Sequence, residues 1–490
     1  MRRFLFQSLI FSVFSIFLLQ CSGSGQTEQP NFLFILVDDL GYMDVGFNNP
    51  ETFYETVHID KLAEGAVRFT NGYAACPVCS PTRASIQTGT HPARLATTDY
   101  FGAPQPENWK RNTPLLPASY REELPLEEVT IAEILKQHGY QTFYAGKWHL
   151  GEEGFWPGDQ GYDVNKGGWT RGGPYGGKKY FSPYGNPRLE DGPEGEHLPD
   201  RLATETAAFM ETNRDEPFLA FLSFYSVHTP LIGRPDLVEK YERKRAERGQ
   251  NDTLWGDEGH RKVRLVQEHA VYAAMVEAMD LAVGKVLNKL EDLELEENTV
   301  VIFMSDNGGL STSEGHPTSN LPLRAGKGWL YEGGIREPML IRWPGVAKRG
   351  SVDHTPVIST DFYPTMLEMA GIDLPSGAAK DGVSLVPLLK DGQVPAREAI
   401  FWHYPHYGNQ GGTPGAAVRA GKYKYIEFFD DTPPELYDLE ADISEKENLS
   451  ECMPEKAAEL KELLRHWQQS VQARLPAEND RFDPDGKVYH

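Results

Sequence analysis

The stretch Asn31-Phe32-Leu33-Phe34-Ile35-Leu36-Val37-Asp38-Asp39 decides the fold. Its apolar run is unbroken, which is typical of a strand buried on both faces of a sheet, and the run stops abruptly at two carboxylates. The same pattern returns at Val300–Ser305, which Asp306 and Asn307 follow directly. We therefore predict two buried strands, each of which presents oxygen-bearing side chains at its carboxyl end.

Strand and helix patterns alternate along most of the chain. Weaker strand patterns occur at 142–145 and 218–224, and helical patterns occur at 128–137 and 269–293. This alternation predicts an α/β fold with a large central sheet, mostly parallel or mixed, and with helices on both faces. Because functional groups gather where the strands of such a sheet end, we expect a site near the acidic residues.

The alternation of strand and helix patterns ends at about residue 375, where Gly and Pro residues mark a boundary. Short strand patterns and one helical pattern follow at 399–404, 417–419, 422–429 and 455–474. We predict a catalytic domain at 31–375 and a C-terminal subdomain at 376–490. The subdomain is expected to be a small antiparallel sheet with one helix packed on it.

Residues 1–20 are typical of an export signal, because Arg2 and Arg3 precede an apolar stretch that is short for a membrane span. Cys21 opens a polar linker at 21–30 and resembles the position at which bacterial lipoproteins are cleaved and lipidated. Gln20 stands where a small residue is usual, so a plain secretory signal is the alternative. We expect an exported protein of the periplasm or cell surface, anchored to the outer membrane if Cys21 is lipidated.

The chain has a formal net charge of −23 and four cysteines, Cys21, Cys76, Cys79 and Cys452. Such an acidic protein is not expected to bind nucleic acid through bulk electrostatics, so an anionic substrate needs a local basic pocket. If Cys21 carries lipid, the other three cysteines cannot all pair with one another. At least one thiol is then expected to remain outside any disulfide and to undergo other chemistry.

Cys79 lies in the run Cys79-Ser80-Pro81-Thr82-Arg83. Pro81 suits the first turn of a helix and Gly89 suits a helix end, so we expect Cys79 at a helix N-terminus, where backbone N–H groups favour an anion. The Cys76-x-x-Cys79 spacing is also compatible with a redox pair, a disulfide or half of a zinc site. No further Cys or His stands nearby at zinc-ligand spacing.

Two segments resemble the signatures of the type I sulfatases, a family of the alkaline-phosphatase-like superfamily. The first is Cys79-x-Pro81-x-Arg83 followed by Thr88-Gly89, with Gln87 in place of the usual apolar residue, and the second is 139–149. Similar motifs at 332–338 and 435–439 occur in the family's order, so the resemblance spans most of 30–450. It implies that a maturation enzyme oxidises Cys79 to formylglycine (3-oxoalanine).

The acidic clusters at the two strand ends offer only oxygen ligands, which favour calcium or magnesium over zinc. Either cluster alone is also compatible with a helix cap or a turn. The resemblance implies that one calcium ion is held by Asp38, Asp39, Asp306, Asn307 and the modified residue 79.

Lys147 and His149 stand two residues apart, so an extended backbone would direct both side chains to one side. The resemblance assigns both to catalysis, together with Arg83, His228 and Lys327. The cations would neutralise the sulfate while one hydroxyl of hydrated residue 79 attacks sulfur. His228 or Lys147 would protonate the departing alcohol, and His149 or a carboxylate would accept a proton as sulfate leaves.

Candidate substrate-binding residues are Asp99, Arg171, Arg324, His403 and His406. Most of them stand in inserts whose aromatic, acidic and His residues suit contacts with a sugar ring, and suit packing and turns equally well. The inserts resemble those of bacterial exo-acting carbohydrate sulfatases, with the 4-sulfate of galactose or N-acetylgalactosamine as a candidate target. Alternatives are a sulfatase of aryl or other esters, a phosphate or phosphonate monoester hydrolase, and a glycan-binding lipoprotein on an inactive scaffold.

Overall fold

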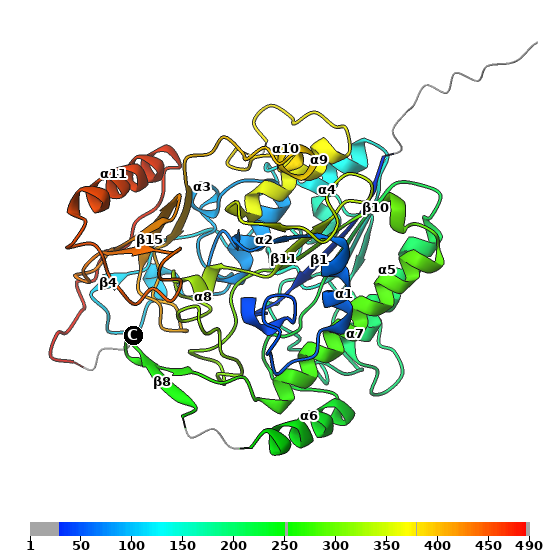
Figure 1. The fold of residues 1–490 in the computed structure, drawn as a ribbon, viewed down its shortest axis with the longest axis horizontal. Helices are drawn as coiled ribbons and strands as arrows, with labels where there is room; N and C mark the ends of the chain where they lie inside the picture. Colours follow the sequence, from blue (N-terminus) through cyan, green and yellow to red (C-terminus); the bar gives the residue numbers. More distant parts are fainter. Residues whose placement is uncertain (1–28, 250–252, 379, 487–490) are drawn as a thin grey trace, which may run out of the picture.

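The computed structural model describes residues 29–249, 253–378 and 380–486 (Figure 1). Within them the main sheet has eight strands in the order β12-β2-β11-β10-β1-β7-β5-β6. Their bounds are β1 (Asn31–Val37), β2 (Val67–Phe69), β5 (Gln141–Gly146), β6 (Val164–Lys166), β7 (Phe218–Ser223), β10 (Thr299–Ser305), β11 (Met339–Arg342) and β12 (Val352–Asp353). The predicted large mixed sheet is confirmed.

The centre of this sheet is parallel and aligns the ends of its strands. β1 pairs in parallel with β10 on one side and with β7 on the other, and β7 pairs in parallel with β5. Val37 lies opposite Ser305, so the residues that follow them leave the sheet at the same edge. β11 runs antiparallel to both β10 and β2, which makes the sheet mixed.

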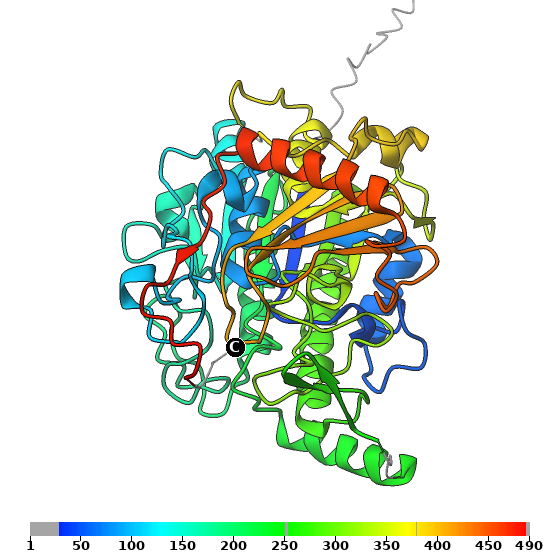
Figure 2. The same cartoon turned by 90° about the vertical axis from the view of Figure 1, so that its left-hand side faces the viewer.

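Helices cover both faces of the sheet (Figures 1 and 2). One layer contains α1 (Val57–Gly65), α5 (Leu198–Thr212), α6 (Pro235–Arg248) and α7 (Ala270–Asp292), and the other contains α2 (Cys79–Thr88), α4 (Ile131–Gln137), α9 (Phe362–Met369) and α10 (Val386–Asp391). Along β1, Leu33, Ile35 and Val37 pack into the first layer, whereas Phe32, Phe34 and Leu36 pack into the second. The unbroken apolar run of β1 therefore serves two cores at once.

The predicted C-terminal antiparallel sheet is present, with α11 (Pro454–Ser470) lying along one face of it (Figure 2). Its strands are β14 (Ile400–Tyr404), β15 (Gly415–Ala420), β16 (Tyr423–Phe428) and β17 (Glu435–Asp438), of which β17 was not expected as a strand. The opposite face packs on the large unit, where Trp402 donates a hydrogen bond to the Ala74 carbonyl. α10 lies beyond the predicted boundary at 375, yet its Leu388 and Leu389 pack in the core of the large unit.

The remaining elements are short. Paired strands are β3 (Gly72–Tyr73) with β13 (Val357–Ile358), β4 (Leu115–Leu116) with β18 (Ala477–Glu478), and β8 (Trp255–Glu258) with β9 (Arg261–Arg264). Short helices are α3 (Pro92–Leu95) and α8 (Glu332–Ile335), and 3-10 turns are Tyr42–Asp44, Pro106–Asn108, Pro157–Gln160, Glu296–Asn298 and Ser359–Asp361. No helix in the described part of the chain is long and apolar enough to cross a membrane. The predicted export signal and Cys21 lie outside the described residues.

Candidate active site

Buried carboxylates meet at the carboxyl edge of the central strands. Asp38 and Asp39 follow β1, Asp306 follows β10, and oxygen atoms of the three side chains lie within 4.8 Å of one another. All three are fully buried. The parallel pairing of β1 and β10 explains this convergence, because it brings the ends of both strands to one place.

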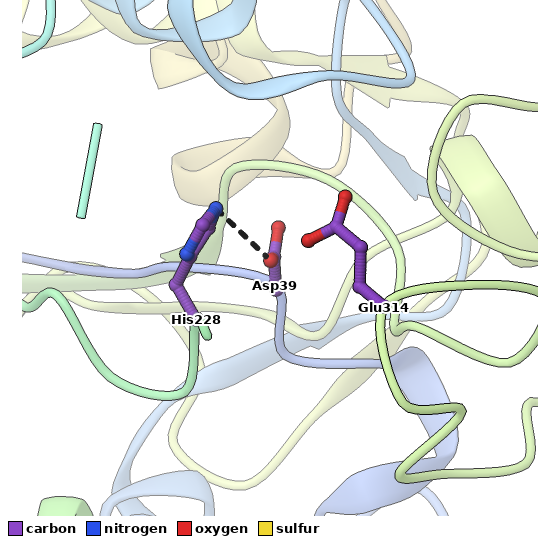
Figure 3. Close-up of side chains that lie close together, drawn as sticks. All are labelled: Asp39, His228 and Glu314. Carbon is purple, nitrogen blue, oxygen red and sulfur yellow. Dashed lines mark ion pairs between the residues drawn. The ribbon is translucent and has the colours of Figure 1, made fainter. Parts of the chain in front are cut away.

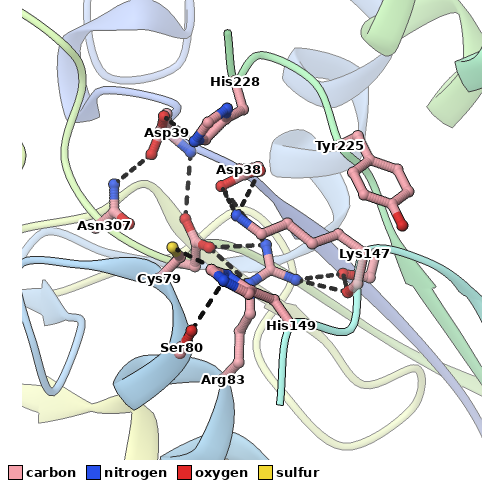
Figure 4. Close-up of polar contacts among 12 residues, drawn as sticks. Asp38, Asp39, Cys79, Ser80, Arg83, Lys147, His149, Tyr225, His228 and Asn307 are labelled. Atoms are coloured by element: carbon pink, nitrogen blue, oxygen red, sulfur yellow. Dashed lines mark hydrogen bonds and ion pairs between the residues drawn. The ribbon is translucent and has the colours of Figure 1, made fainter. Parts of the chain in front are cut away.

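Three buried cations face these carboxylates, and Figure 4 shows two of them, Arg83 and Lys147. The Lys147 ammonium lies 2.8 Å from both oxygens of Asp38, the Lys327 ammonium 2.7 Å from Asp39 Oδ1, and the Arg83 guanidinium 2.7 Å from Asp306 Oδ2. Lys147 comes from the end of β5, Arg83 from α2, and Lys327 from the loop before α8. The sequence candidates from distant segments are thus brought together in one charged cluster.

The charges in this cluster shift one another's pKa values. Burial tends to raise the pKa of Asp39, but Lys327, His228 and Lys147 outweigh this effect and hold it below its ordinary value. Burial also raises the pKa of Asp38 well above its ordinary value, although Lys147 opposes the shift. Burial alone would lower the pKa of Lys327, yet Asp39 raises it well above its ordinary value. Lys327 therefore stays charged at neutral pH and can attract an anion.

Cys79 is the first residue of α2, and its Sγ atom lies 3.5 Å from His149 Nδ1. Ser80 Oγ lies 3.2 Å from the same nitrogen, while His149 Nε2 lies 2.9 Å from the Phe101 carbonyl. Because a carbonyl can only accept, Nε2 carries the proton and Nδ1 is left as an acceptor that faces residue 79. Burial lowers the pKa of His149 well below its ordinary value, which keeps the ring neutral.

Lys147 and His149 do not reach the site by the expected route. Both follow β5, which ends at Gly146, and His149 has a left-handed backbone with φ 58°. The prediction of an extended backbone is therefore wrong at this point. Both side chains nevertheless reach the site, where Lys147 contacts Asp38 and His149 contacts Cys79.

The alternatives for the cysteine pair find no support in the geometry. Cys76, Cys79 and Cys452 are all free thiols, and Cys76 Sγ lies 3.8 Å from the Thr98 carbonyl. Burial raises the pKa of the Cys79 thiol, although Lys147 and Lys327 oppose the shift. An unmodified Cys79 is therefore a protonated thiol at neutral pH and a weak nucleophile.

His228 enters the site from the loop after β7, and its Nε2 atom lies 3.8 Å from Asp39 Oδ2 (Figure 3). Its Nδ1 atom lies 2.7 Å from the Thr229 carbonyl, so Nδ1 donates there and Nε2 faces the site. Burial and then the charge of Lys327 lower the pKa of His228 to about 4.

A pocket of about 510 Å³ borders the cluster of buried charges. Its lining includes Cys79, His149, His228 and Lys327, and among the substrate-binding candidates it includes Arg171. The Arg171 guanidinium lies over the Trp169 ring, 5.1 Å from the ring centre. Arg171 is thus held at the pocket wall.

The other four candidates lie outside the lining of this pocket. Asp99 accepts a hydrogen bond from Tyr404 and lies 3.6 Å from His406, and both are buried. His403 donates to the Arg474 carbonyl and is buried. Arg324 pairs with Glu258 at 2.8 Å and lines a separate cavity of about 590 Å³. Sequence position alone could not show that these side chains are committed elsewhere.

Several pocket residues were not foreseen. Glu314, Tyr175, Asn409 and Gln410 line the pocket, and the last two come from the C-terminal subdomain. They stand in loops without periodic pattern. The one signal that could have found Glu314 is its position in the loop that follows the Asp306-Asn307 pair.

The carboxylate cluster fits a divalent cation. Asn307 Oδ1 is buried and has no hydrogen-bond partner among the described residues, while its Nδ2 atom donates to Asp39 Oδ1 at 2.7 Å. A buried amide oxygen without a partner is costly unless something satisfies it. With Asp38, Asp39 and Asp306 it forms an all-oxygen donor set of the kind that calcium and magnesium prefer.

Comparisons with known proteins agree with this geometry. The family model described as Sulfatase matches residues 30–372, and the model described as N-sulphoglucosamine sulphohydrolase, C-terminal, matches residues 325–472. The chain is 31% identical to a sulfatase of Formosa agariphila over 93% of this chain and 92% of that protein. It is 33% identical to human arylsulfatase A over 94% of this chain and 91% of that protein.

The fold is similar to that of a solved structure of Ps i-CgsB in complex with k-i-k-neocarrahexaose. The TM-score is 0.74 and the identity 28%, with 91% of this chain and 94% of that chain covered. The chain therefore belongs to the sulfatase family, and it is a hydrolase of sulfuric esters.

Proposed function

We propose that this sulfatase removes single exposed sulfate groups from carbohydrates, using a formylglycine made from Cys79 and one calcium ion. The observation that carries the proposal is the position of Cys79. Its side chain lines the pocket at the N-terminus of α2 and lies 3.5 Å from an acceptor nitrogen of His149. The positive charges of Lys147 and Lys327 act on it and lower its pKa against the effect of burial.

The surroundings of Cys79 do not activate its thiol as a nucleophile, and oxidation to formylglycine would explain why they need not. Burial holds the unmodified thiol in its protonated form, so the side chain as encoded is poorly suited to attack sulfur. A hydrated aldehyde would supply two hydroxyls on one carbon, one for attack and one for release. The proposal therefore requires a maturation enzyme as a partner.

His149 is placed to accept the proton that residue 79 must lose. Its Nδ1 atom is an acceptor because Nε2 donates to the Phe101 carbonyl, and it lies 3.2 Å from Ser80 Oγ and 3.5 Å from Cys79 Sγ. Proton transfer to a positioned base of this kind accelerates reactions by about 100- to 10,000-fold.

The cations compensate the charge of the sulfate. Lys147, Lys327 and Arg83 are buried, so their fields act through little water. Asp38, Asp39, Asp306 and Asn307 would hold the calcium ion, which would add a compact positive charge beside the sulfate oxygens. Removal of divalent metal with a chelator should abolish activity and lower the melting temperature, and calcium should restore both.

His228 is placed to protonate the departing alcohol. Its Nε2 atom faces the site beside Asp39 and Lys327, and it can donate only when the ring is doubly protonated. A bound sulfate ester adds negative charge next to the ring and raises its pKa from about 4 toward the working pH. Lys147 is the alternative donor.

A carbohydrate substrate agrees with the pocket's size and lining. A volume of about 510 Å³ holds a small ligand rather than a long chain, which supports action at the end of a glycan. Tyr100, Phe101 and Tyr175 offer ring faces, while Arg171 and Glu314 offer polar contacts. The similar structure with a bound neocarrahexaose supports the same substrate class.

Export is part of the proposal. The signal pattern at 1–20 and the polar linker from Cys21 are consistent with delivery to the periplasm or cell surface, where sulfated glycans arrive. In the native host, Cys21→Ala should move the protein from the membrane fraction to the soluble fraction. An unchanged distribution would contradict lipid anchoring.

The mass of the Cys79 peptide tests the proposed nucleophile. Protein produced together with a maturation enzyme should give the mass of formylglycine in place of cysteine and should cleave nitrophenyl sulfate far faster than nitrophenyl phosphate. An unmodified cysteine in a fully active preparation would overturn the proposal.

A further inference from the structure

Glu314 stands in the active-site pocket and has no part in the chemistry described above. It lies in the loop between β10 and α8, has φ 50° and lines the pocket. A non-glycine residue keeps this left-handed backbone only where its surroundings hold it there. The surroundings of Glu314 therefore hold its backbone in this conformation at the pocket wall.

The carboxylate is held by neutral groups. Gln410 Nε2 donates to Glu314 Oε1 at 2.7 Å, Asn409 Nδ2 donates to the same oxygen at 3.4 Å, and Thr229 Oγ1 donates to Oε2 at 3.5 Å. Within the described residues no Lys, Arg or His nitrogen forms an ion pair with it at 4.0 Å or less. Its negative charge acts at longer range on Lys327 and His228, whose pKa values it raises, but no cation among the described residues is in direct contact with the carboxylate.

Glu314 lies close to His228, the residue proposed above to protonate the departing alcohol. One of its oxygens, an oxygen of Asp39 and a ring nitrogen of His228 lie within 4.8 Å of one another. Figure 3 shows Glu314 and His228 approaching Asp39 from opposite sides.

We infer that Glu314 selects substrates by what the sugar carries next to the sulfate ester. Its carboxylate accepts a hydrogen bond from a free hydroxyl on the neighbouring carbon, and it repels a second sulfate at that position. A carboxylate can only accept hydrogen bonds at neutral pH, so a hydroxyl satisfies it and an anion does not. The inference rests on the proposed carbohydrate substrate and adds its selectivity.

The test uses Glu314→Gln, which keeps the shape of the side chain and removes its charge. Matured wild-type and variant proteins are each assayed on three substrates: nitrophenyl sulfate, galactose 4-sulfate and galactose 3,4-disulfate. If the wild type cleaves another monosulfated sugar faster, that sugar and its disulfated form replace the galactose pair. Glu451→Gln, at an exposed site outside the pocket lining, is the matched control. Activity on nitrophenyl sulfate also shows whether each variant folds.

In the variant, kcat/KM for the monosulfated sugar relative to nitrophenyl sulfate should fall by about 10-fold or more, the effect of a hydrogen bond to a charged group. The preference for the monosulfated over the disulfated sugar should fall as well, because the repulsion is gone. Glu451→Gln should change neither ratio.

Two results overturn the inference and are distinguishable. In the first, the wild type cleaves monosulfated sugars, but Glu314→Gln changes neither the sugar-to-nitrophenyl ratio of kcat/KM nor the monosulfated-to-disulfated ratio by more than about threefold. Such a change is smaller than the effect of one charged hydrogen bond, so Glu314 would not select the substrate. If the wild type cleaves nitrophenyl sulfate but none of the sugars, the proposed carbohydrate function fails and this inference fails with it.

Discussion

His149 Nδ1 lies 3.5 Å from Cys79 Sγ, and the hydrogen bond from His149 Nε2 to the Phe101 carbonyl fixes Nδ1 as the acceptor. This relationship connects two signatures that stand far apart in the sequence. It places a neutral base beside the residue that must become the nucleophile. The predictions below follow from this arrangement and from the buried charges around it.

Replacing His149 by Ala should lower kcat by about 100- to 10,000-fold, because the proton acceptor for residue 79 is lost. KM for nitrophenyl sulfate should change much less, since Lys147 and Lys327 still bind the anion. Steady-state kinetics on matured protein measure both. A large rise in KM with unchanged kcat would instead assign His149 to binding.

Replacing Cys79 by Ser should abolish steady turnover. A serine has one hydroxyl, so it can attack sulfur but cannot release sulfate by collapse to an aldehyde. After incubation of the Cys79→Ser variant with substrate, the mass of the peptide that contains position 79 should increase by one sulfo group or stay unchanged. Near-normal turnover by this variant would contradict the proposed release step.

Lys424→Met should destabilise the fold strongly. The Lys424 ammonium lies 3.0 Å from Glu332 and 2.8 Å from Glu445, and all three side chains are fully buried between the C-terminal sheet and the large unit. Removing the cation leaves the buried Glu445 carboxylate without its cationic partner, whereas Glu332 keeps Arg336 at 2.8 Å. An uncompensated buried charge of this kind costs about 3–5 kcal/mol. Denaturant unfolding measures the loss.

The exposed pair of Arg243 and Glu239 is the control for Lys424. Arg243→Ala should change the free energy of unfolding by less than about 0.5 kcal/mol, as is usual for exposed ion pairs. If both variants lose the same free energy of unfolding, the buried cluster contributes no more to stability than an exposed ion pair does.

His197 should make the fold less stable in acid. Burial lowers its pKa to about 3, and Arg234 adds to the shift. The unfolded chain binds a proton near pH 6.5 whereas the folded protein does not, so the contribution of His197 is present above about pH 6.5 and is lost as the pH falls toward 3. In His197→Phe the loss of stability between about pH 7 and pH 5 should be smaller than in wild type.

The exposed residue His466 provides the comparison for His197. His466→Gln should lose as much stability between the two pH values as wild type does. If His197→Phe also behaves like wild type, the buried imidazole is not a source of the acid sensitivity.

The strands and their polar ends were predictable because local pattern determines them. β1 matches its predicted range because a strand buried on both faces must be apolar throughout, and Asp38 and Asp39 break that rule visibly. The convergence of β1 and β10 followed from the general behaviour of parallel sheets.

The pocket wall was not predictable in the same way. Asp99 and His406 have residue types suited to sugars, but Tyr404 and Thr98 engage them inside the protein. Glu314 and Gln410 lie 96 residues apart in the sequence, and only tertiary packing brings them together. Side chains on irregular loops carry no periodicity from which their direction can be read.

Sulfate release from defined monosulfated sugars tests the central claim most directly. Matured wild-type protein should release inorganic sulfate from at least one monosulfated galactose or N-acetylgalactosamine, with a higher kcat/KM than for nitrophenyl sulfate, and Cys79→Ala should release none. Cleavage of nitrophenyl sulfate without release from any of these sugars would contradict the account.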